Sequence, residues 1–303
     1  MRLTVATAIY RARPDLADNV ASMMAGNEPK DIILIENGTK ALDGQYTNAV
    51  RIHNEENVGV TKALQQALDL CQTEILALFH DDVSIMDSEW DSKVLAAFDA
   101  DPLLGMVTFF GCPGVMSGGG RGGVKAGVAR GYTNMVNGDV HGERRLAPRA
   151  IAVPDSFSLI YRRDMVCDMG GFDMRFVPDH GYDHHLALQF LSVGYHNIYM
   201  PIRCLHGGSR TRRHPDYAKF LRQTEGIDDF QLMMRNRKLR AKIWEPCLPL
   251  FVNEDFSVGA RDPLLFVNAE RSILGYKGNS EYPVFPNGNQ PIEQCGRRRS
   301  DQM

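Results

Sequence analysis

One apolar run that ends in two adjacent acids most constrains how this 303-residue chain can fold. Residues 75–79, Ile-Leu-Ala-Leu-Phe, are too few to cross a membrane and are typical of a strand buried on both faces of a parallel sheet. His80, Asp81 and Asp82 follow directly, and two carboxylates could not stay charged inside a fully buried strand without partners. The run therefore predicts a strand whose carboxyl end opens onto a polar site.

The acid pair at the end of this strand indicates a cation site. In an open α/β sheet, ligands bind just beyond the carboxyl ends of the strands. Carboxylate oxygens at that place favour a divalent cation, which commonly binds phosphates. Two simpler interpretations stay open at this point, because Asp81 and Asp82 could form a solvated pair in the turn or cap the following helix.

Short apolar segments alternate with helical patterns around this run. The sequence predicts further strands over residues 3–9, 31–35 and 50–53. Apolar residues at helical spacing predict one helix after Pro14 and another after Gly59. Strand, helix, strand, strand, helix and strand in this order predict a doubly wound, mostly parallel α/β sheet.

The character of the chain changes after this region. Ser88 and Asp91 have the spacing of a capping box, so a helix is expected to start there. The Gly-rich segment 111–131 has little to bury and predicts a mobile loop, either a lid over a substrate or a connector. Residues 215–244 are expected to be mostly helical, and the basic cluster within 235–242 is interpreted as a solvated helix face or a docking surface for an acidic partner.

Composition narrows the class of protein. The net charge of −3 gives no overall attraction to nucleic acid or anionic membranes. Six cysteines without a Cys-x-x-Cys pair favour reduced core thiols over a disulfide framework. No apolar run approaches the length of about 18 residues that a membrane span needs. The chain passes from Met1 and Arg2 straight into an apolar strand, which leaves no room for a signal peptide and predicts a cytoplasmic enzyme.

A set of short motifs follows the predicted strand order. They are Ala6-Thr7-Ala8-Ile9-Tyr10, Ile35-Glu36-Asn37-Gly38, Asn57-Val58-Gly59-Val60, Phe79-His80-Asp81-Asp82 and Gly170-Gly171-Phe172-Asp173, followed by Asp183, Gly194, Pro201 and His206. Their order resembles that of family 2 glycosyltransferases, enzymes with the GT-A fold that transfer a sugar from a nucleotide-sugar donor. The resemblance covers residues 3–210, and the common order of the motifs carries it.

The resemblance implies a metal site at the end of the strand over residues 75–79. Asp82 would be a metal ligand, His206 would complete the site, and Asp81 would support them. One oxygen and one nitrogen ligand suit Mn²⁺ better than a purely oxygen site does, and Mg²⁺ is the alternative. A histidine that is only hydrogen-bonded in a turn is the simpler interpretation of His206.

The resemblance also implies a catalytic base and a set of donor contacts. Asp183 matches the family's general base, which takes the proton from the acceptor hydroxyl. Its simpler interpretation is an N-cap for a helix that begins at His184. The donor is expected to be a UDP-sugar. The residues expected to contact it are Thr7, Ala8, Tyr10, Glu36, Asn37, Asn57, Gly59, Lys62, His80 and Asp81.

The departures from the family pattern bear on the type of reaction. His80 stands where the family most often has an acid or Asn, and Tyr182 replaces the Glu before the base. The Gln-x-x-Arg-Trp motif and the membrane helices of processive members are missing. One base on the face opposite the leaving group implies a single displacement with inversion. We therefore expect a metal-dependent, inverting, hexosyltransferase-like enzyme that adds one sugar and releases the product.

The expected domain organisation has a GT-A domain over residues 1–210, with a nucleotide-sugar-binding half at 1–110 and an acceptor half at 111–210. Residues 211–303 would form a helical segment and an irregular tail. Two other functions stay open, a sugar nucleotidyltransferase and a non-catalytic nucleotide-sugar or glycan-binding module. The first would need a Gly-rich loop after the first strand, which the chain lacks. A glycan is the expected acceptor, with a lipid-linked sugar or a modified nucleic-acid base as alternatives.

Overall fold

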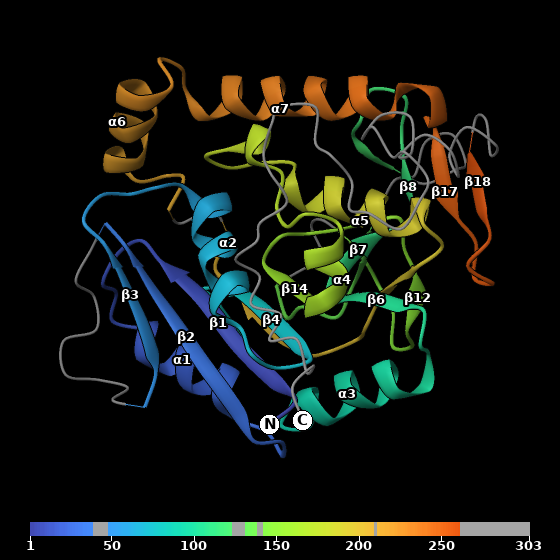
Figure 1. The fold of residues 1–303 in the computed structure, drawn as a ribbon, viewed down its shortest axis with the longest axis horizontal. Coiled ribbons are helices and arrows are strands. Elements are labelled where there is room, and N and C mark those ends of the chain that lie inside the picture. Colours follow the sequence, from blue (N-terminus) through green and yellow to red (C-terminus); the bar gives the residue numbers. More distant parts are fainter. Residues whose placement is uncertain (39–47, 123–130, 138–141, 209–210, 261–303) are drawn as a thin grey trace, which may run out of the picture.

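A central sheet of eight strands forms the body of the molecule in a computed structural model (Figure 1). The structure describes residues 1–38, 48–122, 131–137, 142–208 and 211–260. The strand order is β12-β15-β6-β14-β4-β1-β2-β3. The strands are β1 (Leu3–Ile9), β2 (Lys30–Asn37), β3 (Val50–Asn54), β4 (Ile75–His80), β6 (Leu104–Thr108), β12 (Arg149–Ala150), β14 (Ser158–Arg162) and β15 (His196–Tyr199). β1 pairs in parallel with β2 and β4, whereas β14 runs antiparallel between β4 and β6. The predicted α/β class with a mostly parallel sheet is therefore confirmed.

Helices connect and cover the strands. They are α1 (Leu16–Met24), α2 (Val60–Leu70), α3 (Trp90–Ala100), α4 (Arg163–Asp168), α5 (Tyr182–Ser192), α6 (Pro215–Thr224) and α7 (Asp229–Trp244), with 3₁₀ turns at Met174–Phe176 and Glu245–Cys247. In α2, Ala63, Leu64, Ala67 and Leu68 share one buried face, so the helix contributes its apolar stripe to the core.

Three smaller sheets complete the part of the chain that the structure describes. The first contains β7 (Phe110–Cys112), β10 (Gly131–Thr133), β11 (Gly142–Arg144) and β13 (Val153–Pro154). The second pairs β5 (Val83–Ile85) with β16 (Cys204–His206). The third contains β8 (Gly114–Val115), β9 (Arg121–Gly122), β17 (Leu250–Val252) and β18 (Val258–Ala260).

β4 occupies the centre of the core, as its apolar run predicts. Every residue from Ile75 to Phe79 is buried, and the ring of Phe79 packs against Trp90 (5.4 Å) and Phe109 (5.7 Å). In the parallel register, Ala8 of β1 lies opposite His80 of β4. Because these two strands end level, their polar carboxyl ends open on the same edge of the sheet.

The predicted capping box at Ser88 is wrong. Helix α3 begins at Trp90, and its N-cap residue Glu89 makes no side-chain capping bond. The Asp91 carboxylate is fully buried and turns to other partners, the Lys30 ammonium (2.6 Å) and the backbone N–H of Glu28 (2.9 Å). A buried carboxylate needs such partners, so this need overrides the local capping pattern.

The Gly-rich segment, predicted to be a mobile loop, contains short paired strands. Within the described residues, β8 and β9 pair with each other, and β8 also pairs with β17. Gly119 has a φ of +71°, and a Cβ there would lie 3.1 Å from both Ala241 Cβ and the Arg237 carbonyl oxygen. Glycine is needed here because the turn packs against α7. Residues 123–130 of the predicted lid or connector lie outside the described residues.

The C-terminal part, described up to residue 260, packs on this body. In Figure 1, α7 runs along the upper edge of the molecule, across α5. Trp244 at its end is buried, and its Nε1–H donates to Nδ1 of His185 in α5 (3.1 Å). The helices expected within residues 215–244 are therefore present. The end of α7 shares the core of the sheet domain through Trp244, whereas the buried residues of α6 pack with the start of α7 in a separate cluster.

Composition led to expectations about membrane-spanning helices and about the cysteines. No helix in the described ranges is long and apolar enough to cross a membrane. Cys71, Cys112 and Cys204 are buried free thiols, which agrees for these three with the expected reduced core cysteines.

Candidate functional site

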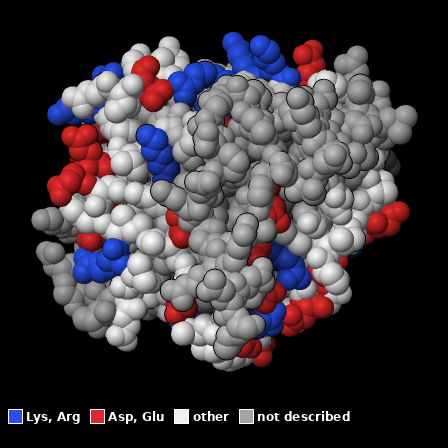
Figure 2. All heavy atoms as spheres, viewed as in Figure 1, with Lys and Arg blue, Asp and Glu red and all other residues white. Residues whose placement is uncertain are grey.

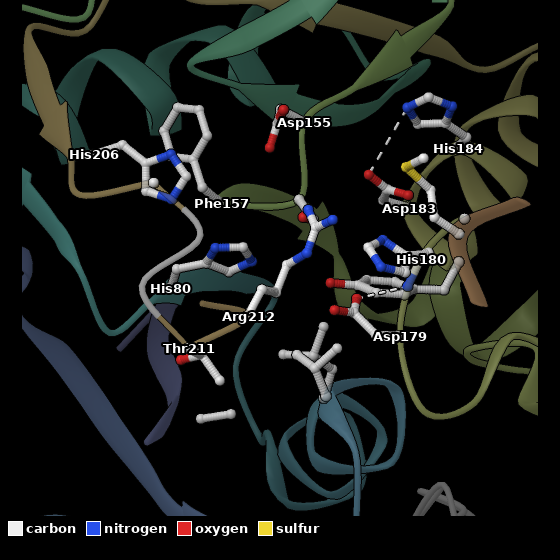
Figure 3. Close-up of a pocket in the computed structure, with 18 of the residues that line it drawn as sticks. His80, Asp155, Phe157, Asp179, His180, Asp183, His184, His206, Thr211 and Arg212 are labelled. Carbon is white, nitrogen blue, oxygen red and sulfur yellow. Dashed lines mark hydrogen bonds and ion pairs between the residues drawn. The ribbon is translucent and has the colours of Figure 1, made fainter. Parts of the chain in front are cut away.

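A cavity of about 600 Å³ opens at the carboxyl ends of β1 and β4. In the view of Figure 3, His80 and His206 lie on one side of it, and Asp183 and His184 lie on the other. Asp155 lies between the two groups. The cavity is therefore the place where strand ends, α5 and the C-terminal helices meet, as expected for a ligand site in an open α/β sheet.

The first wall carries a cluster of metal-ligating side chains. His80 ends β4, Asp82 follows it in the turn, and His206 ends β16. β16 pairs with β5, and in this register His206 lies opposite Val83. The pairing brings the His206 ring to the turn that carries Asp82, although the two residues are 124 positions apart in the sequence. One ligand atom from each of the three residues lies within 4.8 Å of the other two. The structure thus places His80 beside the two residues expected as ligands.

The geometry and electrostatics of this cluster fit a divalent cation. Nε2 of His206 lies 3.2 Å from Oδ1 of Asp82, is buried, and makes no hydrogen bond. Burial raises the pKa of Asp82, but the neighbouring His206 and His80 imidazoles lower it to about 2. The carboxylate is therefore ionised at neutral pH. Two imidazole nitrogens and one carboxylate oxygen suit a transition metal such as Mn²⁺ better than a hard oxygen-only site would.

Asp81 is held beside this cluster by an arginine that the sequence reading missed. Nη1 of Arg13 donates to Oδ1 of Asp81 (3.0 Å), and its Nη2 donates to the Asp81 carbonyl oxygen (2.5 Å). Asn19 donates to the same carbonyl oxygen (3.1 Å). Burial raises the pKa of Asp81 to about 6, although Arg13 opposes the shift. These contacts fix the turn that presents Asp82.

The second wall is formed by the start of α5. The helix begins at Tyr182 with Gly181 as N-cap, and no side chain caps it. The interpretation of Asp183 as a cap for a helix starting at His184 is therefore wrong, because Asp183 already lies inside the first turn. Its carboxyl is buried and lines the cavity. Burial and the nearby Asp155 raise its pKa to about 6, while Arg240, the His184 backbone N–H and Arg121 lower it.

Two arginines and a second aspartate surround Asp183, and none of them was expected from the sequence. Arg121 of the Gly-rich segment pairs with Asp155 (2.6 Å). Burial raises the pKa of Asp155, but Arg121 and then His206 lower it to about 2. Arg240 of α7 is buried in the same wall. The available signal was the helical spacing of Arg237 and Arg240 within the basic cluster, which places both on one face.

Most of the residues expected to contact the donor line the cavity. They are Ala8, Tyr10, Asn37, Asn57, Gly59, His80 and Asp81. Nδ2 of Asn37 donates to Oδ1 of Asn57 (2.8 Å), and Oδ1 of Asn37 accepts from the Val58 N–H (2.9 Å). The two asparagines thus tie the end of β2 to the start of α2 and shape this part of the cavity.

Three of the expected donor residues do not line the cavity. Thr7 is buried inside β1. Glu36 is buried at the end of β2, and its Oε2 pairs with Arg51 (2.9 Å). Lys62 is exposed on α2. The strand or helix that carries each residue directs it away from the cavity, which motif spacing alone could not show.

The two histidines after Asp183 have different environments. His184 lines the cavity, and burial lowers its pKa well below the ordinary value. His185 faces the core, where it accepts from Trp244 and lies 3.3 Å from Asp173. His185 therefore anchors α7 to α5 and does not reach the cavity.

Comparison with known proteins identifies the family to which the chain belongs. The family described as glycosyl transferase family 2 matches residues 4–164, which is more than half of the chain. The chain therefore belongs to this family and is a glycosyltransferase, and the family expected from the motifs is confirmed. No curated protein matches the sequence.

The fold is also that of a solved structure of low sequence identity. GalNAc-T7, solved with UDP, GalNAc and Mn²⁺, is similar with a TM-score of 0.54 and 11% identity over 68% of this chain. The chain spans 44% of the length of that protein. Mannosyltransferase PcManGT from Pyrobaculum calidifontis, solved with GDP-Man and Mn²⁺, has a TM-score of 0.47 and 17% identity, covering 90% of this chain and 74% of its own. S. aureus TarS residues 1–349, solved with UDP-GlcNAc, has a TM-score of 0.45 and 13% identity, covering 78% and 72%.

Proposed function

We propose that this glycosyltransferase moves one sugar from a nucleotide-sugar, with UDP as the nucleotide, to an acceptor hydroxyl, with inversion and with the help of a divalent cation. One observation carries the proposal. A single cavity holds three metal-ligating side chains on one wall and a buried carboxyl of raised pKa, Asp183, on the other. A donor that lies between the two walls would have its diphosphate beside the ligands and its sugar beside the base.

His80, Asp82 and His206 would hold the cation, with Mn²⁺ favoured over Mg²⁺ by the two imidazoles. When bound, the cation would neutralise the negative charge that develops on the leaving diphosphate. GalNAc-T7, whose fold this chain shares, was solved with UDP and Mn²⁺ together, which supports the proposed pair of ligands. Asp81, fixed by Arg13, would support the site from behind.

Asp183 would act as the general base. The acceptor oxygen forms its bond to the anomeric carbon while the bond from that carbon to the diphosphate oxygen breaks, and the hydroxyl proton passes to a carboxylate oxygen of Asp183. With a pKa of about 6, this carboxyl is ionised at neutral pH and is still basic enough to accept a proton. A base on the face opposite the leaving group gives inversion.

The remaining walls would bind the nucleotide and the acceptor. Ala8, Tyr10, Asn37, Asn57 and Gly59 line the part of the cavity proposed for the nucleotide. Thr7, Glu36 and Lys62 would then act from behind or beside this wall. We propose a donor half within 1–110 and an acceptor half within 111–210. The C-terminal segment 211–303 would contribute α7 to the acceptor side.

Donor binding tests the metal requirement. Calorimetric titration of UDP into the protein in Mn²⁺ should show binding, and the same titration in EDTA should show a loss of at least about tenfold in affinity, because the phosphates would lie beside uncompensated carboxylates. Equal affinity in both buffers would remove the cation from the proposal.

A further inference from the structure

Arg240 in α7 is a buried cation without a counter-ion in its immediate surroundings. Its side chain lines the cavity, although the residue is only 6% exposed. Among the described residues, no carboxylate lies within 4.0 Å of its guanidinium group. One Nη2–H donates to the Gly119 carbonyl oxygen, and the buried Nε makes no hydrogen bond. An arginine that is desolvated without an acid partner is costly, so the site is suited to an anion that the ligand supplies.

Arg237, three residues earlier on the same helix, extends this feature. It lines the same cavity, and its Nε–H donates to the Gly118 carbonyl oxygen (2.8 Å). It too has no described carboxylate within 4.0 Å. Other basic residues of the cluster, Arg235, Lys238 and Lys242, are exposed. Figure 2 shows basic side chains along the upper edge, where Figure 1 places α7. The basic cluster is thus divided between a solvated face and a face that lines the cavity.

The Gly-rich turn holds these two arginines in place. Gly118 and Gly119 offer their carbonyl oxygens to Arg237 and Arg240 because the turn packs closely on α7. A guanidinium group has five N–H donors in a rigid plane. Each carbonyl oxygen therefore occupies only part of the donor set and fixes the plane. The remaining donors can bind a carboxylate or phosphate, the anions that arginine binds in a bidentate manner.

The charge balance around Asp183 also favours an added anion. Apart from the metal wall, the cavity lining contains four arginines and three aspartates: Arg121, Arg212, Arg237, Arg240, Asp155, Asp179 and Asp183. With Asp183 ionised, four positive charges therefore face three negative charges. Asp155 is already paired with Arg121. Burial lowers the pKa of Arg240 to about 10, Asp183 opposes this shift, and Arg121 and Arg237 add to it. When Asp183 accepts a proton, the excess of positive charge increases further.

We propose that Arg237 and Arg240 form an anion subsite that binds a carboxylate or phosphate group of the acceptor. The inference rests on the proposed function, since it uses Asp183 as the base. Arg240 lowers the pKa of Asp183, the proposed base, so it lies near the place where the acceptor hydroxyl would lose its proton. The residues proposed to bind the donor diphosphate through the metal lie on the opposite wall, with His80 and His206. The structure therefore favours an acidic glycan over a neutral one as the acceptor.

Free sugars provide a direct test. The protein is saturated with UDP and Mn²⁺ to fill the donor site and is then titrated with D-glucuronate and with D-glucose, followed by NMR. Wild type should bind glucuronate at least about tenfold more tightly than glucose, the size expected for a charge-assisted bidentate contact. Arg240→Gln should lose this preference. The control Lys238→Gln, on the exposed face of the same helix, should keep it.

Further variants keep the test decisive. If Arg240→Gln fails to fold, Arg237→Gln, which is less buried, should still lower the preference for glucuronate. Equal binding of the two sugars to wild type, or a preference that survives both arginine substitutions, would overturn the subsite. If Arg240→Gln weakens UDP-glucuronate relative to UDP-glucose and leaves free glucuronate unaffected, the anion belongs to the donor, and the acceptor assignment fails. UDP and Mn²⁺ binding, measured in each variant, shows whether the donor site of the proposed function is intact.

Discussion

The two walls of the cavity differ in how their side chains are held. The metal wall is built on the sheet, where strand ends and the β5–β16 pairing bring His80, Asp82 and His206 together. The acceptor wall is built by contacts between distant segments, in which α7 and the Gly-rich turn place Arg240 and Arg121 around Asp183. We propose that the sheet positions the donor and its metal, whereas the added segments determine which acceptor binds.

Asp82→Asn should have the largest effect on the metal wall. The substitution removes the only carboxylate of the three-residue cluster and leaves its two imidazoles. Mn²⁺ affinity and UDP affinity should therefore both fall by at least about 100-fold, which is more than the loss caused by removing a residue that only supports a metal ligand. Mn²⁺ titration followed by electron paramagnetic resonance measures the first and calorimetry the second. If UDP binds this variant as tightly as wild type, the sheet does not fix the donor through a metal.

His80→Ala should weaken Mn²⁺ by about 10- to 100-fold, since one of three ligands is removed and the others remain. The control His53→Ala removes an imidazole on β3 that does not line the cavity, and it should leave the affinity unchanged. Titration of Mn²⁺ in the absence of donor gives the comparison. Identical affinities for the two variants would assign His80 to the donor, as expected from the sequence, and reduce the metal set to Asp82 and His206.

Ionisation of Asp183 on the acceptor wall should determine how turnover depends on pH. Asp183 must be ionised to accept a proton, and its pKa of about 6 is the balance of burial and Asp155, which raise it, against Arg240, the His184 N–H and Arg121, which lower it. At saturating donor and Mn²⁺, kcat should rise with pH through about 6 and fall about tenfold per unit below it. A flat profile from pH 7 to pH 5 would contradict the assignment of the base.

Of these substitutions, Gly119→Ala should have the smallest effect, a loss of stability in the turn that packs on α7. The glycine has a φ of +71°, and an added Cβ would meet Ala241 and the Arg237 carbonyl oxygen at 3.1 Å. Gly226→Ala is the control, because its φ is +69° and nothing lies within 4 Å. The control should cost about 1 kcal/mol for backbone strain alone, and Gly119→Ala should cost more. Thermal unfolding measures both, and equal losses would show that the turn does not pack closely on α7.

The two walls also differ in how far the sequence could predict them. The run that ends in His80, Asp81 and Asp82 predicted its strand and its polar end because burial and local pattern agree there. His206 could be placed beside Asp82 only through the order of family motifs. Arg121 and Arg240 were not predicted as site residues, because Arg121 pairs with Asp155, 34 residues away, and Arg240 contacts the Gly119 carbonyl oxygen, 121 residues away. The helical spacing of Arg237 and Arg240 shows that the two share a face, but it does not show what that face contacts. The capping box at Ser88 failed for a related reason, since the long-range partners of Asp91 outweigh a local signal.

The measurement that tests the central claim most directly is a comparison of turnover and UDP affinity in Asp183→Asn. Asparagine keeps the shape of the side chain and cannot accept the acceptor's proton. With Asp164→Asn as the control, an exposed acid on α4 outside the cavity, kcat should fall by at least about 100-fold in Asp183→Asn alone. The dissociation constant for UDP in Mn²⁺ should stay within about twofold of wild type in both variants, because the lost contact forms only in the transition state. Turnover near that of wild type, or a parallel loss of UDP affinity, would contradict the division of the cavity into a metal wall that binds the donor and an acceptor wall that carries the base.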